Sequence, residues 1–549
     1  MRERTSRILC ALLLALAVGT VFSLGVGDYH LSGDDWGYTV GCPFVKDGVT
    51  LANVVRALTD FTYCAIWMPV TYFTYMLDVS LFGGGWTVHL ATNAFLHSTT
   101  AVVAFFFLLM LARRLFGEDG RSATAICLLG ALAWALHPMR AEVASYVASR
   151  KETLWTLFAL LGLMEWTLFC ERGGKLRYAL VMLCFVLSCL SKPTAICFPL
   201  LAYALKAVLE RRLFCRAWSV LPMLAVSAAV GLLTIHSQAN PTGMEQVDVF
   251  GSGLGWRILN AGVALGLHVW HTLVPGTIHV DYRAVFDGWP VDGGLGLGVL
   301  SVCTLATVAG LLYAKDAATR VLIAFAVAWF AFGLAPTLGV FGYVNGDQAY
   351  ADRYAYLPNL AFSFLLLALV RRKGDRTRRA AWTVLGMLVV GEVAVDVPVI
   401  RSFRSDYTAF ARTLEKDPDH WRALRIVGNE SCARLGRMDE GVRMLRKSLR
   451  LRGSQRTADS LAYILALRGA PGDDAEVLRL GAPFAANPGR DVHGLMLDAL
   501  GIVCLRQGKA RQAVQLFEAS LKAPRREHAR RYTLDNLNKA NAALAKGER

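Results

Sequence analysis

Residues 8–38 read ILCALLLALAVGTVFSLGVGDYHLSGDDWGY, an apolar run followed by a short polar stretch with two adjacent aspartates. The run from Ile8 to Val26 is long enough for one helix to cross a membrane. Arginines precede it, as in a signal peptide, but the run is long for one and lacks a small-residue cleavage site. We therefore expect a retained helix. Either interpretation places Asp34 and Asp35 outside the cytoplasm.

The composition of the whole chain is that of a membrane protein. Hydrophobic residues make up 55% of the 549 residues and charged residues only 18%, which is outside the range of soluble globular proteins. The formal net charge is +16. Basic residues of such proteins gather in cytoplasmic loops, so the charge indicates topology and we expect no nucleic-acid partner. The prediction is an all-α polytopic membrane protein.

The distribution of basic residues predicts how the chain crosses the membrane. Every second connection between the early apolar segments is rich in Arg or Lys, which places those connections in the cytoplasm. The basic loop at 371–379 is also expected in the cytoplasm. Counting crossings back from this loop, the chain reaches the correct side only if Trp256 to Val274 does not cross the membrane, so we expect an interfacial helix there and about eleven crossings in all. The early segments lie at about 87–112, 122–136, 153–170, 176–190, 194–209 and 217–235.

The C-terminal part of the chain is polar and amphipathic, and its small residues recur at a fixed period. Gly436 and Gly508 lie about two repeat lengths apart in the tetratricopeptide pattern, in which small residues let two antiparallel helices approach. We expect a transmembrane domain over 1–400, with 27–86 as its first external loop. A domain of about three tetratricopeptide repeats is predicted over 401–549, outside the cytoplasm.

The pair Asp34 and Asp35 has two interpretations. Aspartates that follow a membrane segment can cap an interfacial helix. They can also supply a general base for an acceptor hydroxyl, because two neighbouring carboxylates raise one another's pKa toward the useful range. The residues alone favour neither interpretation.

The external loop from His137 to Glu152 concentrates ionisable residues between two apolar segments. Its basic residues could neutralise a phosphate while its glutamates hold them in place. An interfacial loop with snorkelling side chains is the alternative. His137, Glu142 and the Asp pair could also ligate a divalent metal, although no metal-ligand spacing supports this. The candidate residues for the phosphate are Arg140, Glu142, Arg150 and Lys151.

Two further cationic residues lie at segment entries on the same predicted face. Lys192 precedes Pro193, and Arg353 lies between Asp352 and Tyr354. A lysine at such an entry is usually a snorkelling residue. An arginine flanked by an aspartate and a tyrosine suits a phosphate with a sugar stacked beside it. We therefore add Lys192, Arg353 and Tyr354 to the predicted donor site.

Several strings in this order resemble a known family. They are HPMRAEVASYVASRKETLWTLFALLGL from His137, KPTAICFP from Lys192, ADRYAYLP from Ala351, and Asp34-Asp35 followed by MPVT from Met68 and by Leu77-Asp78. Together they resemble the transmembrane and tetratricopeptide-repeat O-mannosyltransferases and their bacterial relatives. The resemblance covers most of residues 8–400 and extends into the repeats. Many bacterial relatives carry Asp where Glu152 stands and Arg where Met68 stands.

The resemblance implies a GT-C glycosyltransferase fold, with an acidic motif in the first external loop and a polyprenyl-phosphate sugar as the donor. On that basis Asp34 or Asp35 occupies the catalytic acidic position. The charged residues that match motif positions are Arg140, Glu142, Arg150, Lys151, Lys192 and Arg353. Their individual roles are inferred from charge.

The expected function is transfer of mannose or another hexose to a protein Ser or Thr, or to a glycan hydroxyl, outside the cytoplasm. The repeats would present a surface to the polypeptide acceptor. Two alternatives of other classes remain: a non-catalytic membrane scaffold, and a transporter of lipid-linked sugars. The strings look closest to the bacterial relatives, so we expect a bacterial inner membrane. For a eukaryotic chain, the endoplasmic reticulum membrane is expected.

Overall fold

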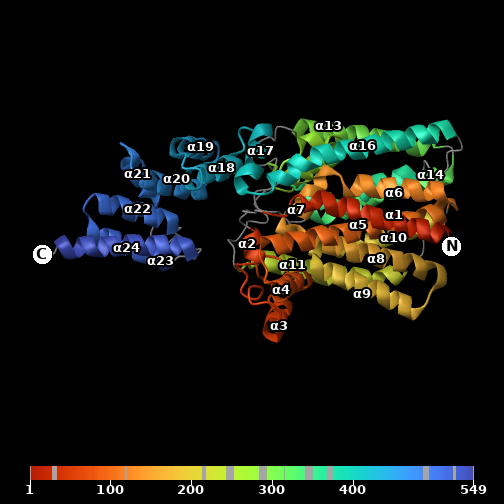
Figure 1. The fold of residues 1–549 in the computed structure, drawn as a ribbon, viewed down its shortest axis with the longest axis horizontal. Helices are drawn as coiled ribbons and strands as arrows, with labels where there is room; N and C mark the ends of the chain where they lie inside the picture. The colour runs from red at the N-terminus through yellow and green to blue at the C-terminus, as the bar shows by residue number, and fades with distance from the viewer. Residues whose placement is uncertain are drawn as a thin grey trace. The chain divides into compact units, whose positions relative to one another are not determined.

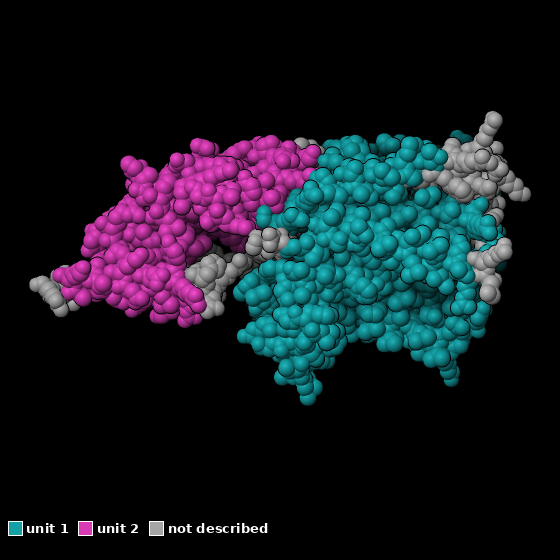
Figure 2. Space-filling model, viewed as in Figure 1, with its two compact units in different colours: residues 1–405 teal, residues 406–549 magenta. Residues whose placement is uncertain are grey.

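The computed structural model separates the chain into two compact units, residues 1–405 and 406–549 (Figure 2). Where the structure describes the chain it is helical, and its β-structure is one isolated bridge between Tyr63 and Thr242. The predicted boundary after residue 400 falls within the helix Asp375–Ser402. The described residues are 2–27, 34–117, 120–212, 218–242, 253–283, 293–314, 316–340, 350–367, 375–485, 494–522 and 527–547.

The first unit is a bundle of long helices with shorter helical turns at their ends (Figure 1). Its longer helices are α1 (Arg2–Ser23), α3 (Leu51–Thr59), α4 (Pro69–Phe82), α5 (Trp86–Phe116), α6 (Arg121–Ala135), α8 (Arg150–Arg172), α9 (Lys175–Ser191), α10 (Phe198–Glu210), α11 (Leu221–Ala239), α12 (Leu254–Leu273), α13 (Gly293–Tyr313), α14 (Ala317–Leu334) and α16 (Asp375–Ser402). Its short elements include α2 (Asp34–Tyr38), η1 (Pro138–Arg140), α7 (Ala141–Ser145), η3 (Pro193–Cys197), η8 (Asp352–Ala355) and α15 (Leu360–Leu366).

Seven helices of the described chain are long and apolar enough to cross a membrane, and a bent pair, Arg121–Ala135 with Pro138–Ser145, makes up to eight. This is compatible with a multi-pass membrane protein. The helix predicted to be interfacial, α12, is not among the seven. Of the predicted crossings named above, 176–190 is also not among the seven, because α9 has only 17 residues, and 122–136 is counted only within the bent pair. The seven are Glu3–Ser23, Trp86–Phe116, Val147–Arg172, Pro193–Glu210, Trp218–Ala239, Gly293–Tyr313 and Ala317–Thr337.

Helix α5 lies inside the bundle and packs against α1, α6 and α8 (Figure 1). Buried polar side chains around it hold the segment 350–358 in place. The Trp134 indole N–H donates to the Tyr356 carbonyl oxygen at 2.8 Å, and the Trp329 indole N–H donates to the Leu357 carbonyl oxygen at 3.0 Å. His97 Nδ1 lies 2.6 Å from the Tyr356 hydroxyl oxygen. Because each of these groups is buried, the hydrogen bonds fix the backbone that carries Arg353.

The second unit is a stack of helices in which consecutive helices pack as pairs, the arrangement that the tetratricopeptide pattern predicts. Small residues permit close packing within the pairs: a Cβ atom added to Gly441 would lie 2.4 Å from the Gly428 carbonyl oxygen. Gly436 and Gly508 instead have φ values of 66° and 76°. They therefore form the turns between paired helices, where glycine avoids backbone strain, and do not supply the packing surface. The helices are α17 (Asp406–Lys416), α18 (Trp421–Ala433), α19 (Met438–Leu451), α20 (Gln455–Arg468), α21 (Asp473–Ala485), α22 (Gly494–Arg506), α23 (Ala510–Lys522) and α24 (Glu527–Gly547).

Candidate functional site

Three of the predicted cationic residues converge in the first unit, and we refer to Lys151, Lys192 and Arg353 as the cationic cluster. The Lys192 ammonium lies 4.6 Å from the centroid of the Tyr354 ring, and the Arg353 guanidinium lies 5.1 Å from the same centroid. Lys151 is close enough to Lys192 and Arg353 to interact with their charges. Three like charges in one place are costly unless they bind anions, so the cluster requires acidic partners or an anionic ligand.

Each residue of the cationic cluster is held at the end of a helix or in a helical turn. Lys151 lies in the first turn of α8. Lys192 follows the end of α9 and has an extended backbone, as expected for a residue before proline. Arg353 lies in the short turn η8. All three therefore lie at helix ends or in a short helical turn, and not in helix interiors.

Two buried glutamates pair with two of the three cations. Glu142 accepts a hydrogen bond from the Arg353 backbone N–H at 2.9 Å and also pairs with its guanidinium group. Glu152 pairs with the Lys192 ammonium and accepts a hydrogen bond from the Trp155 indole at 2.9 Å. Glu142 and Glu152 thus each pair with one cation, and the third, Lys151, interacts with the charge of Asp34.

Burial and pairing act in opposite directions on the cations. Burial lowers the pKa of the Lys192 ammonium, although the charge of Glu152 opposes this. Burial also favours the neutral form of Arg353, but the charge of Glu142 outweighs it and raises the pKa of that guanidinium. Arg353 therefore stays positive at any physiological pH.

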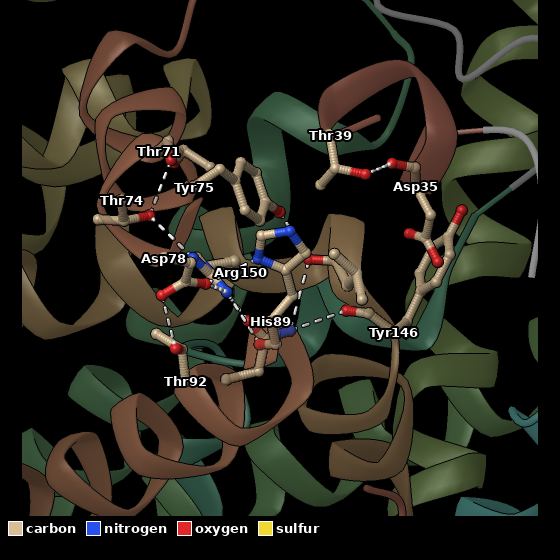
Figure 3. Close-up of polar contacts among 12 residues, drawn as sticks. Asp35, Thr39, Thr71, Thr74, Tyr75, Asp78, His89, Thr92, Tyr146 and Arg150 are labelled. Atoms are coloured by element: carbon tan, nitrogen blue, oxygen red, sulfur yellow. Dashed lines mark hydrogen bonds and ion pairs between the residues drawn. The ribbon is translucent and has the colours of Figure 1, made fainter. Parts of the chain in front are cut away.

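The aspartate pair is divided by the short helix α2, which directs the two side chains to different surroundings. Asp35 is buried, and its Oδ1 accepts a hydrogen bond from the Ala148 backbone N–H at 2.7 Å. The Thr39 hydroxyl donates to the Asp35 carbonyl oxygen at 2.5 Å (Figure 3). Asp34 is exposed and near enough to Lys151 to interact with its charge. Asp35 thus anchors α2, and Asp34 remains accessible beside the cationic cluster.

Tyr38, a residue not predicted for the site, links α2 to the cluster. Its hydroxyl accepts a hydrogen bond from the Lys151 ammonium at 3.2 Å, and its ring centroid lies 4.3 Å from the same nitrogen. Tyr38 follows Asp34 by one helical turn. Residues one turn apart share a helix face, so the spacing from Asp34 could have indicated from the sequence that Tyr38 belongs to the site.

Arg150 was predicted to bind phosphate, but the structure places it in a separate buried network with Asp78 (Figure 3). Its Nη2 donates to Asp78 Oδ2 at 2.6 Å and to the His89 carbonyl oxygen at 2.8 Å, and its Nε donates to Asn93 Oδ1 at 2.8 Å. The guanidinium carbon lies 4.3 Å from the Tyr75 ring centroid. We call this set the Arg150–Asp78 network.

Asp78 is the acceptor at the centre of this network. Its Oδ2 also lies 2.7 Å from His89 Nδ1, and its Oδ1 accepts a hydrogen bond from the Thr92 hydroxyl at 2.8 Å. Burial opposes ionisation of Asp78, but the hydrogen bond to His89 and the charge of Arg150 together lower the pKa of this carboxyl. The network is therefore a neutralised ion pair whose main donors and acceptors are used within the protein.

Arg140, the other predicted phosphate ligand outside the cationic cluster, is also fully buried. Its guanidinium carbon lies 5.7 Å from the Trp134 ring centroid and 5.3 Å from that of Tyr356. Its Nη1 donates to the Ala355 carbonyl oxygen at 3.4 Å. This arrangement supports the backbone next to Arg353, and we leave Arg140 out of the proposed phosphate site.

A histidine that was not predicted for the site fixes the residue before Arg353. His271, in α12, places Nδ1 2.9 Å from Asp352 Oδ1, and the Tyr282 hydroxyl donates to Asp352 Oδ2 at 2.5 Å. Burial opposes ionisation of Asp352, but the charge and hydrogen bond of His271 lower its pKa. The turn η8 is therefore held from both sides, by α12 through Asp352 and by α7 through Glu142.

The residues that the structure describes do not form the ligand set of a metal site. Within it, no group of three or more His, Cys, Asp or Glu side chains is arranged to hold a metal ion. His137, the predicted imidazole ligand, uses both ring nitrogens: Nδ1 accepts from the Met139 N–H at 3.2 Å, and Nε2 lies 3.0 Å from the Thr272 carbonyl oxygen.

Comparisons with known proteins add little to this geometry. No family model matches the sequence, and no curated protein matches it. A solved structure to which the chain is similar is yeast Tom70, with 11% sequence identity over 81% of this chain and 96% of that chain, and a TM-score of 0.23. A TM-score this low supports no argument about fold or function.

Proposed function

We propose that the chain is a membrane glycosyltransferase of the GT-C type, which moves a sugar from a polyprenyl phosphate to a hydroxyl acceptor. The observation that supports it is the accessible carboxylate of Asp34 next to the cationic cluster, in a bundle of apolar helices. A base beside a phosphate-binding group is what glycosyl transfer from a lipid phosphate requires. The family resemblance of the motif strings supports the same assignment.

In this proposal the cationic cluster binds the donor phosphate. A phosphodiester carries one negative charge, and Lys151, whose charge interacts with that of the exposed Asp34, is proposed to contact it together with Lys192 and Arg353. The Tyr354 ring lies against two of these cations, and the sugar is proposed to lie beside this residue.

Asp34 is the proposed general base. It would accept the proton of a Ser or Thr hydroxyl, or of a sugar hydroxyl, as the hydroxyl oxygen bonds to the anomeric carbon with inversion. The bond between that carbon and the phosphate oxygen breaks, and its electron pair remains on the phosphate, where the cationic cluster stabilises the added charge. Asp35 and the Arg150–Asp78 network serve as supports in this scheme.

The finer topology belongs to the same proposal. We propose about eleven crossings with α12 at the interface, and an active site on the external face of a bacterial inner membrane. The helix pairs of the second unit would meet a polypeptide acceptor on the same side of the membrane. A eukaryotic chain would have the equivalent arrangement in the endoplasmic reticulum.

The test is transfer of a radiolabelled sugar from polyprenyl phosphate to Ser- and Thr-containing peptides by the purified protein in nanodiscs. Asp34→Asn is expected to lower the rate by at least about 100-fold, the usual contribution of a general base. Asp47→Asn, which changes an exposed aspartate of the same loop, is the control and should leave the rate unchanged. Equal, measurable rates for wild type and Asp34→Asn would contradict the role of Asp34, and no transfer by wild type would contradict the enzyme assignment and favour a scaffold or a transporter.

A further inference from the structure

Two cysteines of the predicted first external loop meet at the side chain of one tyrosine. Cys42 and Cys64 are the two cysteines of residues 27–86, and each has a free thiol in the structure. Both thiols are close enough to the Tyr63 hydroxyl group to form a hydrogen bond with it. They are also close enough to each other that ionisation of one disfavours ionisation of the other. The fold therefore brings together two thiols that are far apart in the sequence.

Backbone hydrogen bonds hold the chain on both sides of this meeting point. The Tyr63 hydroxyl donates to the Gly41 carbonyl oxygen at 3.3 Å, directly before Cys42. On the other side, the Cys64 N–H donates to the Thr242 carbonyl oxygen at 2.8 Å. Tyr63 and Thr242 also form the isolated bridge of the structure. A disulfide bond requires the two side chains to face one another at short range, and this fixed backbone keeps the thiols together.

The surroundings of the two thiols make them slow to react in the folded protein. Cys42 has no exposed surface, and Cys64 is only partly exposed. Burial raises the pKa of each thiol to about 12, and the charge of Asp34 adds to this effect at Cys64. Because the thiolate is the reactive form, both thiols react slowly once the loop is packed. A disulfide at the same place would be shielded from reductants by the same burial.

The backbone at Cys64 has a conformation that the surrounding structure must maintain. Cys64 and Ala65 have φ values of 51° and 58°, in the left-handed region that residues with a side chain rarely adopt. Such a conformation costs free energy and persists only where neighbouring contacts fix it. A covalent bond from Cys64 to Cys42 would supply such a contact.

We propose that Cys42 and Cys64 become joined by a disulfide bond as the loop folds in an oxidising compartment. Two S–H bonds break and one S–S bond forms. The two electrons and two protons pass to a protein or small-molecule disulfide, which is reduced to two thiols. The external placement of the loop, on which this inference rests, is part of the proposed function. The exchange would precede complete packing of the loop, because both thiols are still accessible then.

The bond would stabilise the part of the loop that packs against α2. The Tyr63 hydroxyl donates to the Gly37 carbonyl oxygen in α2 at 2.8 Å. A Cβ atom added to Gly37 would lie 3.4 Å from Cys64 Sγ. A cross-link between residues 42 and 64 reduces the freedom of the unfolded chain, which favours the folded loop. The disulfide would therefore help to keep α2, and with it Asp34, in place.

The test maps the cysteines by mass spectrometry and does not depend on sugar transfer. The full-length protein is taken from the inner membrane of a bacterial host and denatured in N-ethylmaleimide without reductant, so that thiols are labelled and disulfides are kept. Proteolysis is expected to give a linked pair of peptides containing Cys42 and Cys64, neither of them labelled. In the matched control, Cys42→Ser, Cys64 should carry the label. Reductant should lower the thermal unfolding temperature of wild type and leave that of the Cys42→Ser, Cys64→Ser double variant unchanged.

A second sample separates failure of the pairing from failure of the proposed topology. Purified protein is incubated for an extended time with oxidised glutathione at mildly alkaline pH before the same labelling. A linked peptide pair in this sample alone would support the pairing of the two thiols and contradict the external placement of the loop. Label on both Cys42 and Cys64 in both samples would overturn the proposal, and so would a bond from either residue to a different cysteine.

Discussion

Arg150 and Lys151 are adjacent in one sequence motif but belong to two different regions of the molecule. Arg150 is fully buried in the Arg150–Asp78 network, where a carboxylate, an amide oxygen and a carbonyl oxygen accept its hydrogen bonds. Lys151 contacts the Tyr38 hydroxyl and lies near Asp34 in the cationic cluster. The difference teaches that two adjacent basic residues of one motif can have separate surroundings: a closed network of buried partners for Arg150, and the proposed donor site for Lys151.

Breaking the Arg150–Asp78 network should have the largest effect on stability. Asp78→Asn or Arg150→Leu leaves a buried charge without its partner, which typically costs about 3–5 kcal/mol. We expect a large fall in the thermal unfolding temperature of the detergent-solubilised protein. Changing both residues together to Asn and Leu should cost less than the sum of the two single changes. Additive costs would show that the two groups do not act as a pair.

Removing a charge from the cationic cluster should affect binding and spare stability. Lys151→Gln deletes the cation next to Asp34, so we expect the KM for the lipid-linked sugar to rise about tenfold, from the loss of one charge-assisted contact. The unfolding temperature should stay close to that of wild type, because the change also removes the repulsion of Lys151 by Lys192 and Arg353. A marked loss of stability with no change in KM would show that Lys151, like Arg150, has a structural role.

Lowering the pH should have a smaller effect on stability, and this effect tests the Arg150–Asp78 network. The pKa of Asp78 is lowered in the folded protein, so its ion pair stabilises the fold fully above the unfolded value of about 4, and this stabilisation is lost as pH falls through the folded value. The stabilisation from Asp78 should therefore be fully present and unchanged between about pH 5 and 8. Below about pH 4, wild type should lose stability more steeply than Asp78→Asn. Parallel curves for the two proteins would contradict the ion pair.

Sequence reasoning reached the helical fold and most of the residues that converge. Apolar runs specify helices by length, and this holds for residues 8–26 and for the segment after Trp86. The positive-inside rule grouped Lys151, Lys192 and Arg353 on one face, and the structure brings these residues together. Their role in binding stays a prediction.

The rest depended on contacts between residues distant in sequence. Adjacent residues on a helix point about 100° apart, so nothing local distinguishes Asp34 from Asp35 or Arg150 from Lys151. The distinction is made by Ala148 for Asp35 and by Asp78 for Arg150, far away along the chain. The apolar spacing of α3, by contrast, was readable from Leu51, Val55 and Leu58 alone, but only the structure shows that this face is unburied.

The most direct measurement of the central claim is equilibrium binding of a fluorescent polyprenyl-phosphate sugar to the purified protein in nanodiscs. Wild type is expected to bind, Lys151→Gln to bind about tenfold more weakly, and Asp34→Asn to bind at least as tightly as wild type while transferring sugar at least about 100-fold more slowly. That result would separate phosphate binding by the cationic cluster from proton transfer by Asp34. Failure of wild type to bind, or equal binding by wild type and Lys151→Gln, would contradict the claim that the cationic cluster holds the donor phosphate.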